Sequence, residues 1–172
     1  MKRVILLLLV LVAVSAAVAG SVTTSARANP ILEDIQTYRH ITWKWQGLMQ
    51  VRRTVSWRHE RHAGVAYRTW IRRLWQKRAA TAWRRAQNPP HEAAWRCIHR
   101  YEGAWTDTGA PYYGGLQMDI SFQQTYGSDL LARKGTADHW TPIEQMWVAE
   151  RAYRSGRGFY PWPNTARYCG LI

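Results

Sequence analysis

The feature that most constrains the fold is a change in sequence character at Pro89 and Pro90. Residues 31–87 contain no proline, and their apolar residues recur at steps of three, four or seven. This spacing is typical of helices with one apolar face. It predicts a helical stripe that runs to Val55, a break at residues 62–64, and a second stripe that the two prolines end. The region is therefore expected to form a helical hairpin or two consecutive helices.

The charge changes at the same place. Residues 30–90 hold 13 Lys and Arg against three Asp and Glu, whereas residues 91–172 hold eight of each. Of the total net charge of +13, the first segment carries +10 and the second carries none. A basic protein that binds nucleic acid along its whole length is thereby excluded, and no nucleic-acid partner is expected.

The arginines and tryptophans of residues 31–90 leave two interpretations open. They can be the solvated faces of helices that pack on each other. Alternatively they contact an anionic partner, either membrane headgroups or an anionic wall polymer, because arginine and tryptophan together suit a polar interface.

Residues 1–28 have the anatomy of an export signal. Lys2 and Arg3 precede an apolar run over residues 4–14, and small residues follow. Residues 17–19 and 26–28 each offer a cleavage site with alanine at the first and third positions. The expected localisation is therefore secreted or at the cell wall, with an uncleaved N-terminal membrane anchor as the alternative.

Residues 91–172 are expected to form a small domain, and the fold class expected for the chain is α+β, mostly helical. Its two cysteines, Cys97 and Cys169, predict one disulfide in an exported chain, with two free buried thiols as the alternative. Helix-start signals are predicted at Asn88, Asp119 and Thr141, the last as a capping box with Glu144.

One carboxylate has the surroundings of a general acid. Glu102 precedes Gly103, the predicted end of a helix, where the helix macrodipole disfavours negative charge. Tyr101 and Trp105 flank it and would exclude water, which favours the protonated form. No nucleophile with a base and no cluster with metal-ligand spacing is present, so neither a cofactor nor a metal is expected.

Two stretches of this domain resemble a known family. They are residues 97–105, CIHRYEGAW, and residues 112–119, YYGGLQMD. Both are similar to the transglycosylase-like domain of resuscitation-promoting factors, a lysozyme-like fold of actinobacterial cell-wall proteins. Residues 144–151 resemble the last long helix of the family, and Trp162, Pro163 and Cys169 resemble its end. The resemblance covers about residues 91–172.

The resemblance implies roles for individual residues. Glu102 matches the catalytic glutamate, which protonates the bond between N-acetylmuramic acid and N-acetylglucosamine. Tyr113 and Gln117 lie in the matching glycine-rich run, and Asp119, Ser121 and Gln145 fall where the family places polar groups along the cleft. In addition, Trp105, Tyr112 and Tyr113 are candidates for stacking on sugar faces, with core packing as the alternative. Cys97 departs from the pattern, because it lies five residues before the glutamate instead of directly before it.

The expected function is cleavage of β-1,4 bonds in peptidoglycan by a single glutamate that acts first as acid and then as base, as in a lytic transglycosylase or a muramidase. The expected partner is the glycan strand. The alternative is a noncatalytic wall-binding protein whose cleft holds glycan and whose basic helices hold wall polymer. Asp107 or Asp119 would be the second carboxylate of a two-acid mechanism, although Asp119 is better explained as a helix cap.

Overall fold

The structure is a computed structural model that describes residues 29–55 and 64–172. It is mostly helical, with 67% helix, seven α-helices and one two-stranded sheet in the part described. This confirms the predicted mostly helical class.

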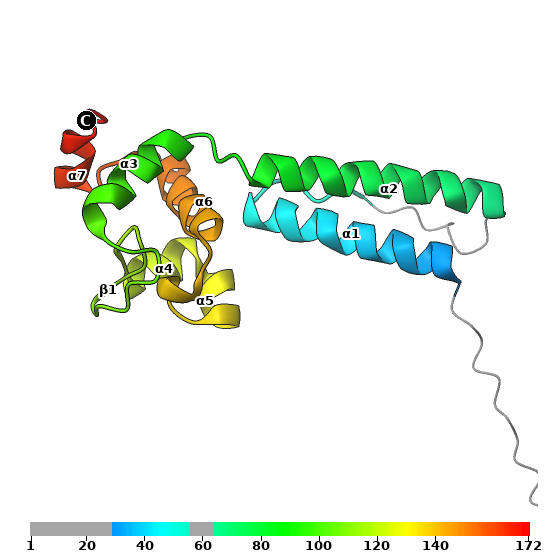
Figure 1. The fold of residues 1–172 in the computed structure, drawn as a ribbon, viewed down its shortest axis with the longest axis horizontal. Coiled ribbons are helices and arrows are strands. Elements are labelled where there is room, and N and C mark those ends of the chain that lie inside the picture. Colours follow the sequence, from blue (N-terminus) through cyan, green and yellow to red (C-terminus); the bar gives the residue numbers. More distant parts are fainter. Residues whose placement is uncertain (1–28, 56–63) are drawn as a thin grey trace, which may run out of the picture.

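The first two helices form a parallel pair. α1 (Pro30–Leu48) and α2 (Val65–Ala86) lie side by side, and both end next to the C-terminal domain (Figure 1). At the far end of the pair, Asp34 of α1 forms an ion pair with Arg72 of α2 at 3.4 Å. The two helices are therefore consecutive and parallel, and they do not form an antiparallel hairpin. We call them the helix pair.

The chain between the two helices corrects the predicted end of α1. The helix stops at Leu48, and residues 51–55, the return segment, run back along it. Thr54 fixes this segment: its amide donates to Oε1 of Gln46 at 3.0 Å, and its carbonyl accepts from Nε1 of Trp43 at 2.9 Å. Val55, predicted to continue the apolar stripe, is 73% exposed.

Residues 92–172, the C-terminal domain, contain the remaining elements. The helices are α3 (Glu92–Glu102), α4 (Ile120–Tyr126), α5 (Ser128–Lys134), α6 (Pro142–Ala152) and α7 (Pro163–Tyr168). β1 (Tyr112–Tyr113) and β2 (Met118–Asp119) pair antiparallel, with Tyr112 opposite Asp119. A short 3-10 helix (Ala137–His139) precedes α6 and a π-helical turn (Tyr153–Arg157) follows it.

Local capping signals position most of these helices. Oδ1 of Asp119 accepts from the amide of Phe122 at 2.6 Å, and Thr141 and Glu144 form the predicted capping box. The predicted cap at Asn88 is wrong, because α3 begins at Glu92. The amide of His91, just before it, donates instead to the buried carboxylate of Glu150 at 2.8 Å.

The hydrophobic core lies around α6, in which residues 145–152 are all buried. Trp95 of α3 and Trp162 pack there with ring centroids 5.2 Å apart. The same cluster takes in Leu48 and Ala86, so the ends of the helix pair belong to the core of the C-terminal domain.

Three side chains of α6 and the turn after it bind the C-terminal ends of the helix pair. Nη2 of Arg151 donates to the carbonyl of Leu48 at 2.9 Å, and Nη2 of Arg154 donates to that of Met49 at 3.1 Å. Nε1 of Trp147 donates to the carbonyl of Ala86 at 2.7 Å. Helix C-termini carry unpaired carbonyls and partial negative charge, so two arginines and an indole N–H are suitable partners.

Cys97 of α3 and Cys169, directly after α7, form a disulfide. Their Cα atoms are 6.0 Å apart, within the normal range for such a bridge. The predicted pairing is confirmed, and the shifted position of Cys97 on the helix still lets α3 reach the chain end.

The expected localisation is corrected by the structure. In residues 29–55 and 64–172, no helix is long and apolar enough to cross a membrane. The apolar run over residues 4–14, which suggested secretion or an N-terminal anchor, lies outside the described residues, as does the whole predicted signal at 1–28.

Candidate functional site

Glu102 is the last residue of α3 and is held by α7. Its Oε1 atom accepts a hydrogen bond of 2.7 Å from the hydroxyl of Thr165, a residue that is only 8% exposed. Gly103 ends the helix, with its amide donating to the carbonyl of His99 at 3.3 Å. The carboxylate is therefore half-buried and fixed from one side.

A groove of about 340 Å³ lies beside this carboxylate, between the β-strands, α4 and the chain before α7. Its lining is mostly polar and aromatic, and consists of Tyr112, Gln117, Met118, Asp119, Ser121, Phe122, Thr125, Tyr126, Arg157, Pro161 and Trp162. Three of the predicted substrate-binding residues, Gln117, Asp119 and Ser121, are thus brought together.

Two contacts connect Glu102 to one end of the groove, although Glu102 is not itself in the lining. A Cβ atom on Gly103 would lie 3.1 Å from Nε2 of Gln117, a lining residue. The Thr165 hydroxyl also lies 3.4 Å from the carbonyl of Trp162, another lining residue. A sugar chain in the groove would therefore contact Gln117 and Trp162, which lie next to Gly103 and Thr165, the two residues that border Glu102.

The two nearby aspartates are used by the fold. Asp119 caps α4. Asp107 accepts from the amide of Gly109 at 2.9 Å through Oδ1 and from Nε2 of Gln117 at 2.9 Å through Oδ2. Asp107 therefore orients Gln117 with both of its oxygens engaged, whereas Glu102 and Asp119 each accept a hydrogen bond through one oxygen.

Three predicted substrate-binding residues lie away from the groove. Trp105 stacks on His99 with ring centroids 3.9 Å apart, and Tyr113 packs half-buried against the core. Tyr112, the neighbour of Tyr113, faces the groove instead and is 49% exposed. Successive side chains of a strand point to opposite faces, so only one of the two tyrosines of β1 can face the groove.

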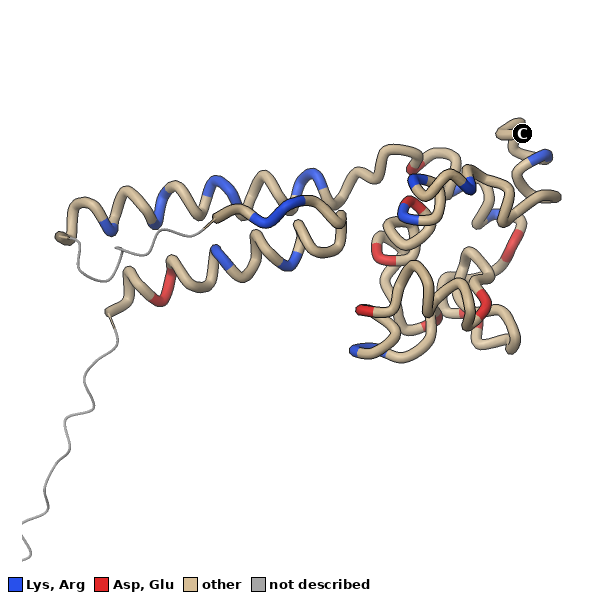
Figure 2. The backbone as a smooth tube through the Cα atoms, turned by 180° about the vertical axis from the view of Figure 1, so that it is seen from behind, with Lys and Arg blue, Asp and Glu red and all other residues tan. Residues whose placement is uncertain are grey.

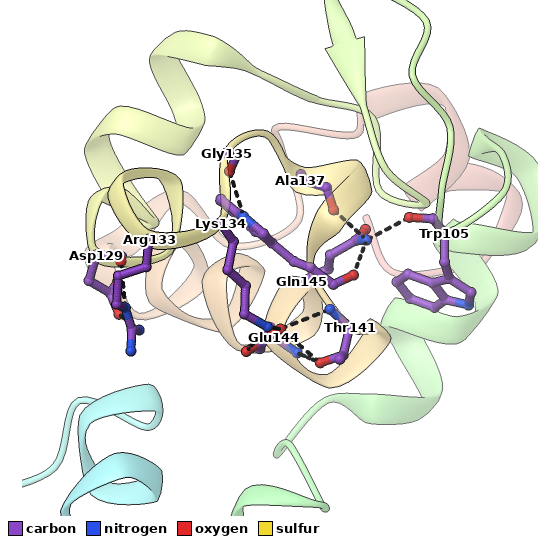
Figure 3. Close-up of polar contacts among 10 residues, drawn as sticks. Trp105, Asp129, Arg133, Lys134, Gly135, Ala137, Thr141, Glu144 and Gln145 are labelled. Carbon is purple, nitrogen blue, oxygen red and sulfur yellow. Dashed lines mark hydrogen bonds and ion pairs between the residues drawn. The ribbon is translucent and has the colours of Figure 1, made fainter. Parts of the chain in front are cut away.

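Gln145, the third, is fully buried and corrects the expectation of a place along the cleft (Figure 3). Its Nε2 atom donates to the carbonyls of Trp105 at 2.7 Å and Ala137 at 2.8 Å, and its Oε1 accepts from the amide of Gly115 at 2.8 Å. A Cβ on Gly114 would come within 2.5 Å of this side chain. The glycine run thus folds around Gln145, which positions the loop that carries Gln117.

Arg157 gives one wall of the groove a positive charge. Its guanidinium lies 5.9 Å from the ring of Phe122. A hydrogen bond from Ser155 lowers the pKa of the Tyr126 phenol, and Arg157 adds to this effect. The groove can therefore accommodate a substrate that carries a negative group as well as hydroxyls.

Sequence reasoning missed Thr165, Trp162 and Arg157 as site residues. Thr165 had one usable signal: it lies four residues before Cys169, so a helix there would place it on the same face as the cysteine that bridges to α3. Trp162 and Arg157 had none, because their approach to α4 depends on the π-helical turn and the loop after it.

Glu144, the residue before Gln145, lies between Lys134 and Thr141 (Figure 3). Its contacts predict how the stability of the fold depends on pH. Burial raises the pKa of its carboxyl, but hydrogen bonds from Lys134 and Thr141 outweigh burial and hold the pKa below its ordinary 4.5. A carboxyl with a lowered pKa in the folded state stabilises the fold above that ordinary value, and this stabilisation is lost as the pH falls through the lowered pKa.

We therefore expect Glu144→Gln to reduce the free energy of unfolding by about 1 kcal/mol at neutral pH, because it removes a partly exposed ion pair and weakens the capping box. Urea unfolding of both proteins across the acid range measures this. The difference between them should shrink below pH 4.5. If the difference in free energy of unfolding between the two proteins stayed constant to the lowest pH at which both fold, the ion pair of Glu144 would not be the cause of the stabilisation.

Among the residues that the structure describes, no group of three or more His, Cys, Asp or Glu side chains is placed to hold a metal ion. Comparison of the chain with models of protein families, with curated proteins and with solved structures found no match.

Proposed function

We propose that the C-terminal domain is a lysozyme-like domain that cleaves the β-1,4 bond between N-acetylmuramic acid and N-acetylglucosamine in peptidoglycan. The observation that carries the proposal is the position of Glu102: its carboxylate is fixed by Thr165, and the next residue, Gly103, lies against Gln117 in the lining of a polar, aromatic groove. The proposal is also supported by the resemblance of residues 97–105 and 112–119 to the transglycosylase-like domain of resuscitation-promoting factors.

The lining suits a glycan strand. Gln117 and Ser121 offer an amide and a hydroxyl to sugar hydroxyls. Tyr112 presents an exposed ring on which an apolar sugar face can stack. Arg157 can pair with a carboxylate of the muramic acid lactyl group or of the attached peptide.

In the proposed reaction, protonated Glu102 donates its proton to the oxygen that joins the two sugars. The bond from this oxygen to C1 of N-acetylmuramic acid breaks, and the electron pair leaves with the oxygen, which becomes the hydroxyl of N-acetylglucosamine. The ionised Glu102 then removes a proton from the nucleophile that attacks C1. That nucleophile is either the 6-hydroxyl of the same muramic acid, which gives an anhydro ring, or water.

A single-glutamate reaction is favoured over a two-carboxylate one. The latter needs a second carboxylate free to attack or to activate water. Asp107 binds Gly109 and Gln117 through both of its oxygens, and Oδ1 of Asp119 is held as the cap of α4.

Thr165 is a positioning residue in this proposal. Thr165→Val keeps the volume but removes the hydroxyl that orients Glu102, so turnover of peptidoglycan should fall about tenfold, the equivalent of one hydrogen bond to a charged group. Thr165→Ser restores a hydroxyl and should recover most of the activity. Equal activity of the valine and serine variants, at equal thermal stability, would show that the hydroxyl does not act on Glu102.

A further inference from the structure

A second pocket, of about 260 Å³, lies within the helix pair. α1, α2 and the return segment each provide one wall. The lining comprises Thr42, Gln46, Met49, Val51, Thr54, Lys77, Arg78, Thr81, Ala82 and Arg85. No residue of the groove beside Glu102 belongs to it.

The polar chemistry of this pocket is that of an anion site. Lys77, Arg78 and Arg85 line it, and none of its described lining residues is acidic. The described carboxylates of the helix pair, Glu33 and Asp34, lie in the first turns of α1, at the far end from Arg85 (Figure 2). The hydroxyls of Thr54 and Thr81 add further hydrogen-bonding groups at the same walls.

Arg78 brings a positive charge with restricted mobility to the pocket wall. Its Nη1 atom is buried and has no hydrogen-bond partner among the described residues. The guanidinium lies 4.9 Å from the ring centroid of Trp75, which is itself fully buried and limits the movement of the arginine. Because Nη1 has almost no solvent-accessible surface, Arg78 acts on an anion in the pocket through the positive charge of its guanidinium and not through this atom.

The rim of the pocket is preorganised. Nε2 of Gln46 donates to the Thr54 hydroxyl at 2.7 Å, and the Thr54 amide donates back to Gln46 at 3.0 Å. These bonds hold the return segment over the space between α1 and α2, so a ligand would enter a formed site instead of a flat basic surface.

We infer that this pocket binds a phosphate group. Two guanidinium groups and an ammonium provide donors only, and the planar fork of arginine matches the oxygens of phosphate. The phosphate is either free or one unit of a phosphodiester polymer. The inference does not depend on the glycosidase proposal, and Glu102→Gln should bind phosphate as the native chain does.

Calorimetric titration of the full chain with inorganic phosphate, and separately with a short glycerol-phosphate oligomer, tests the inference. Both titrations are done near physiological ionic strength, where diffuse surface attraction is screened. We expect saturable binding of inorganic phosphate that Arg78→Gln weakens at least tenfold. Tighter binding of the oligomer would identify a polymer as the source of the phosphate, and binding of inorganic phosphate alone would identify the free anion.

Arg73→Gln is the matched control, because it removes the same charge from an exposed position of the same helix outside the pocket. It should change the affinity less than twofold. Lys77→Gln, also at an exposed position, gives a second test if Arg78→Gln destabilises the helix pair, and it should weaken binding at least fivefold. Absence of binding, or equal weakening by Arg73→Gln and Lys77→Gln, would overturn the inference.

Discussion

Glu102→Gln is expected to slow the release of soluble fragments from purified peptidoglycan by about 10²–10⁴-fold, the usual contribution of a general acid. Glutamine keeps the shape of the side chain and can still accept the hydrogen bond from Thr165, but it has no proton to donate to the glycosidic oxygen. Turbidity loss of a peptidoglycan suspension, followed over time, measures the effect. The thermal stability of the variant should remain near that of the native chain.

Glu92→Gln is the matched control. It makes the same chemical change at the first residue of α3, where Glu92 pairs with Arg96 at 2.7 Å outside the groove. Its activity should be unchanged. If Glu102→Gln solubilised peptidoglycan at the native rate, the catalytic role of Glu102 would be wrong. If neither the native chain nor Glu102→Gln released fragments, and both bound peptidoglycan, the domain would be a noncatalytic binding module.

The reaction products show whether the 6-hydroxyl of muramic acid or water attacks C1. Mass spectrometry distinguishes anhydromuramyl ends from hydrolysed ends because they differ by one water. The measurement therefore separates a lytic transglycosylase from a muramidase, which the arrangement of Glu102 and Thr165 alone does not do.

Reduction of the Cys97–Cys169 disulfide is expected to lower the free energy of unfolding by about 4 kcal/mol, because the bridge closes a long loop in the unfolded chain. The two cysteines are 72 residues apart in sequence and enclose most of the C-terminal domain. Activity should fall as well. The amide of Cys169 donates to the carbonyl of Thr165 at 3.0 Å, so the bridge helps to hold α7, and with it Thr165, against Glu102.

Urea unfolding with and without reductant measures this change. Cys97→Ser/Cys169→Ser serves as the control, since it should show the lower stability under both conditions and no response to reductant. Equal midpoints for the oxidised and reduced native chain would contradict the stabilising role of the bridge.

The parts of the fold that depend on neighbouring residues could be predicted from the sequence. The caps at Asp119 and Thr141 are local, since each side chain binds an amide three residues later. The end of α1 and the start of α3 could not be predicted. Thr54 turns back to bind Gln46, and His91 is bound by Glu150, which is 59 residues away. Contacts of this kind leave no periodic signal in the chain.

The candidate site divides in the same way. The motif at residues 112–119 led to Gln117 and Asp119, which line the groove. Gln145 resembles a cleft residue in sequence, but its amide binds backbone groups of Trp105, Gly115 and Ala137, a role that only the folded chain reveals. Thr165 reaches Glu102 because of where α7 packs, across 63 residues of sequence.

The docking of the helix pair onto α6 has a consequence for cooperativity. Trp147 and Arg151 are one turn apart on this helix, and each holds the carbonyl end of one member of the pair. Separation of the pair from the domain would remove the partners of these carbonyls and open the core at Ala86, so we expect the two parts to unfold in one step.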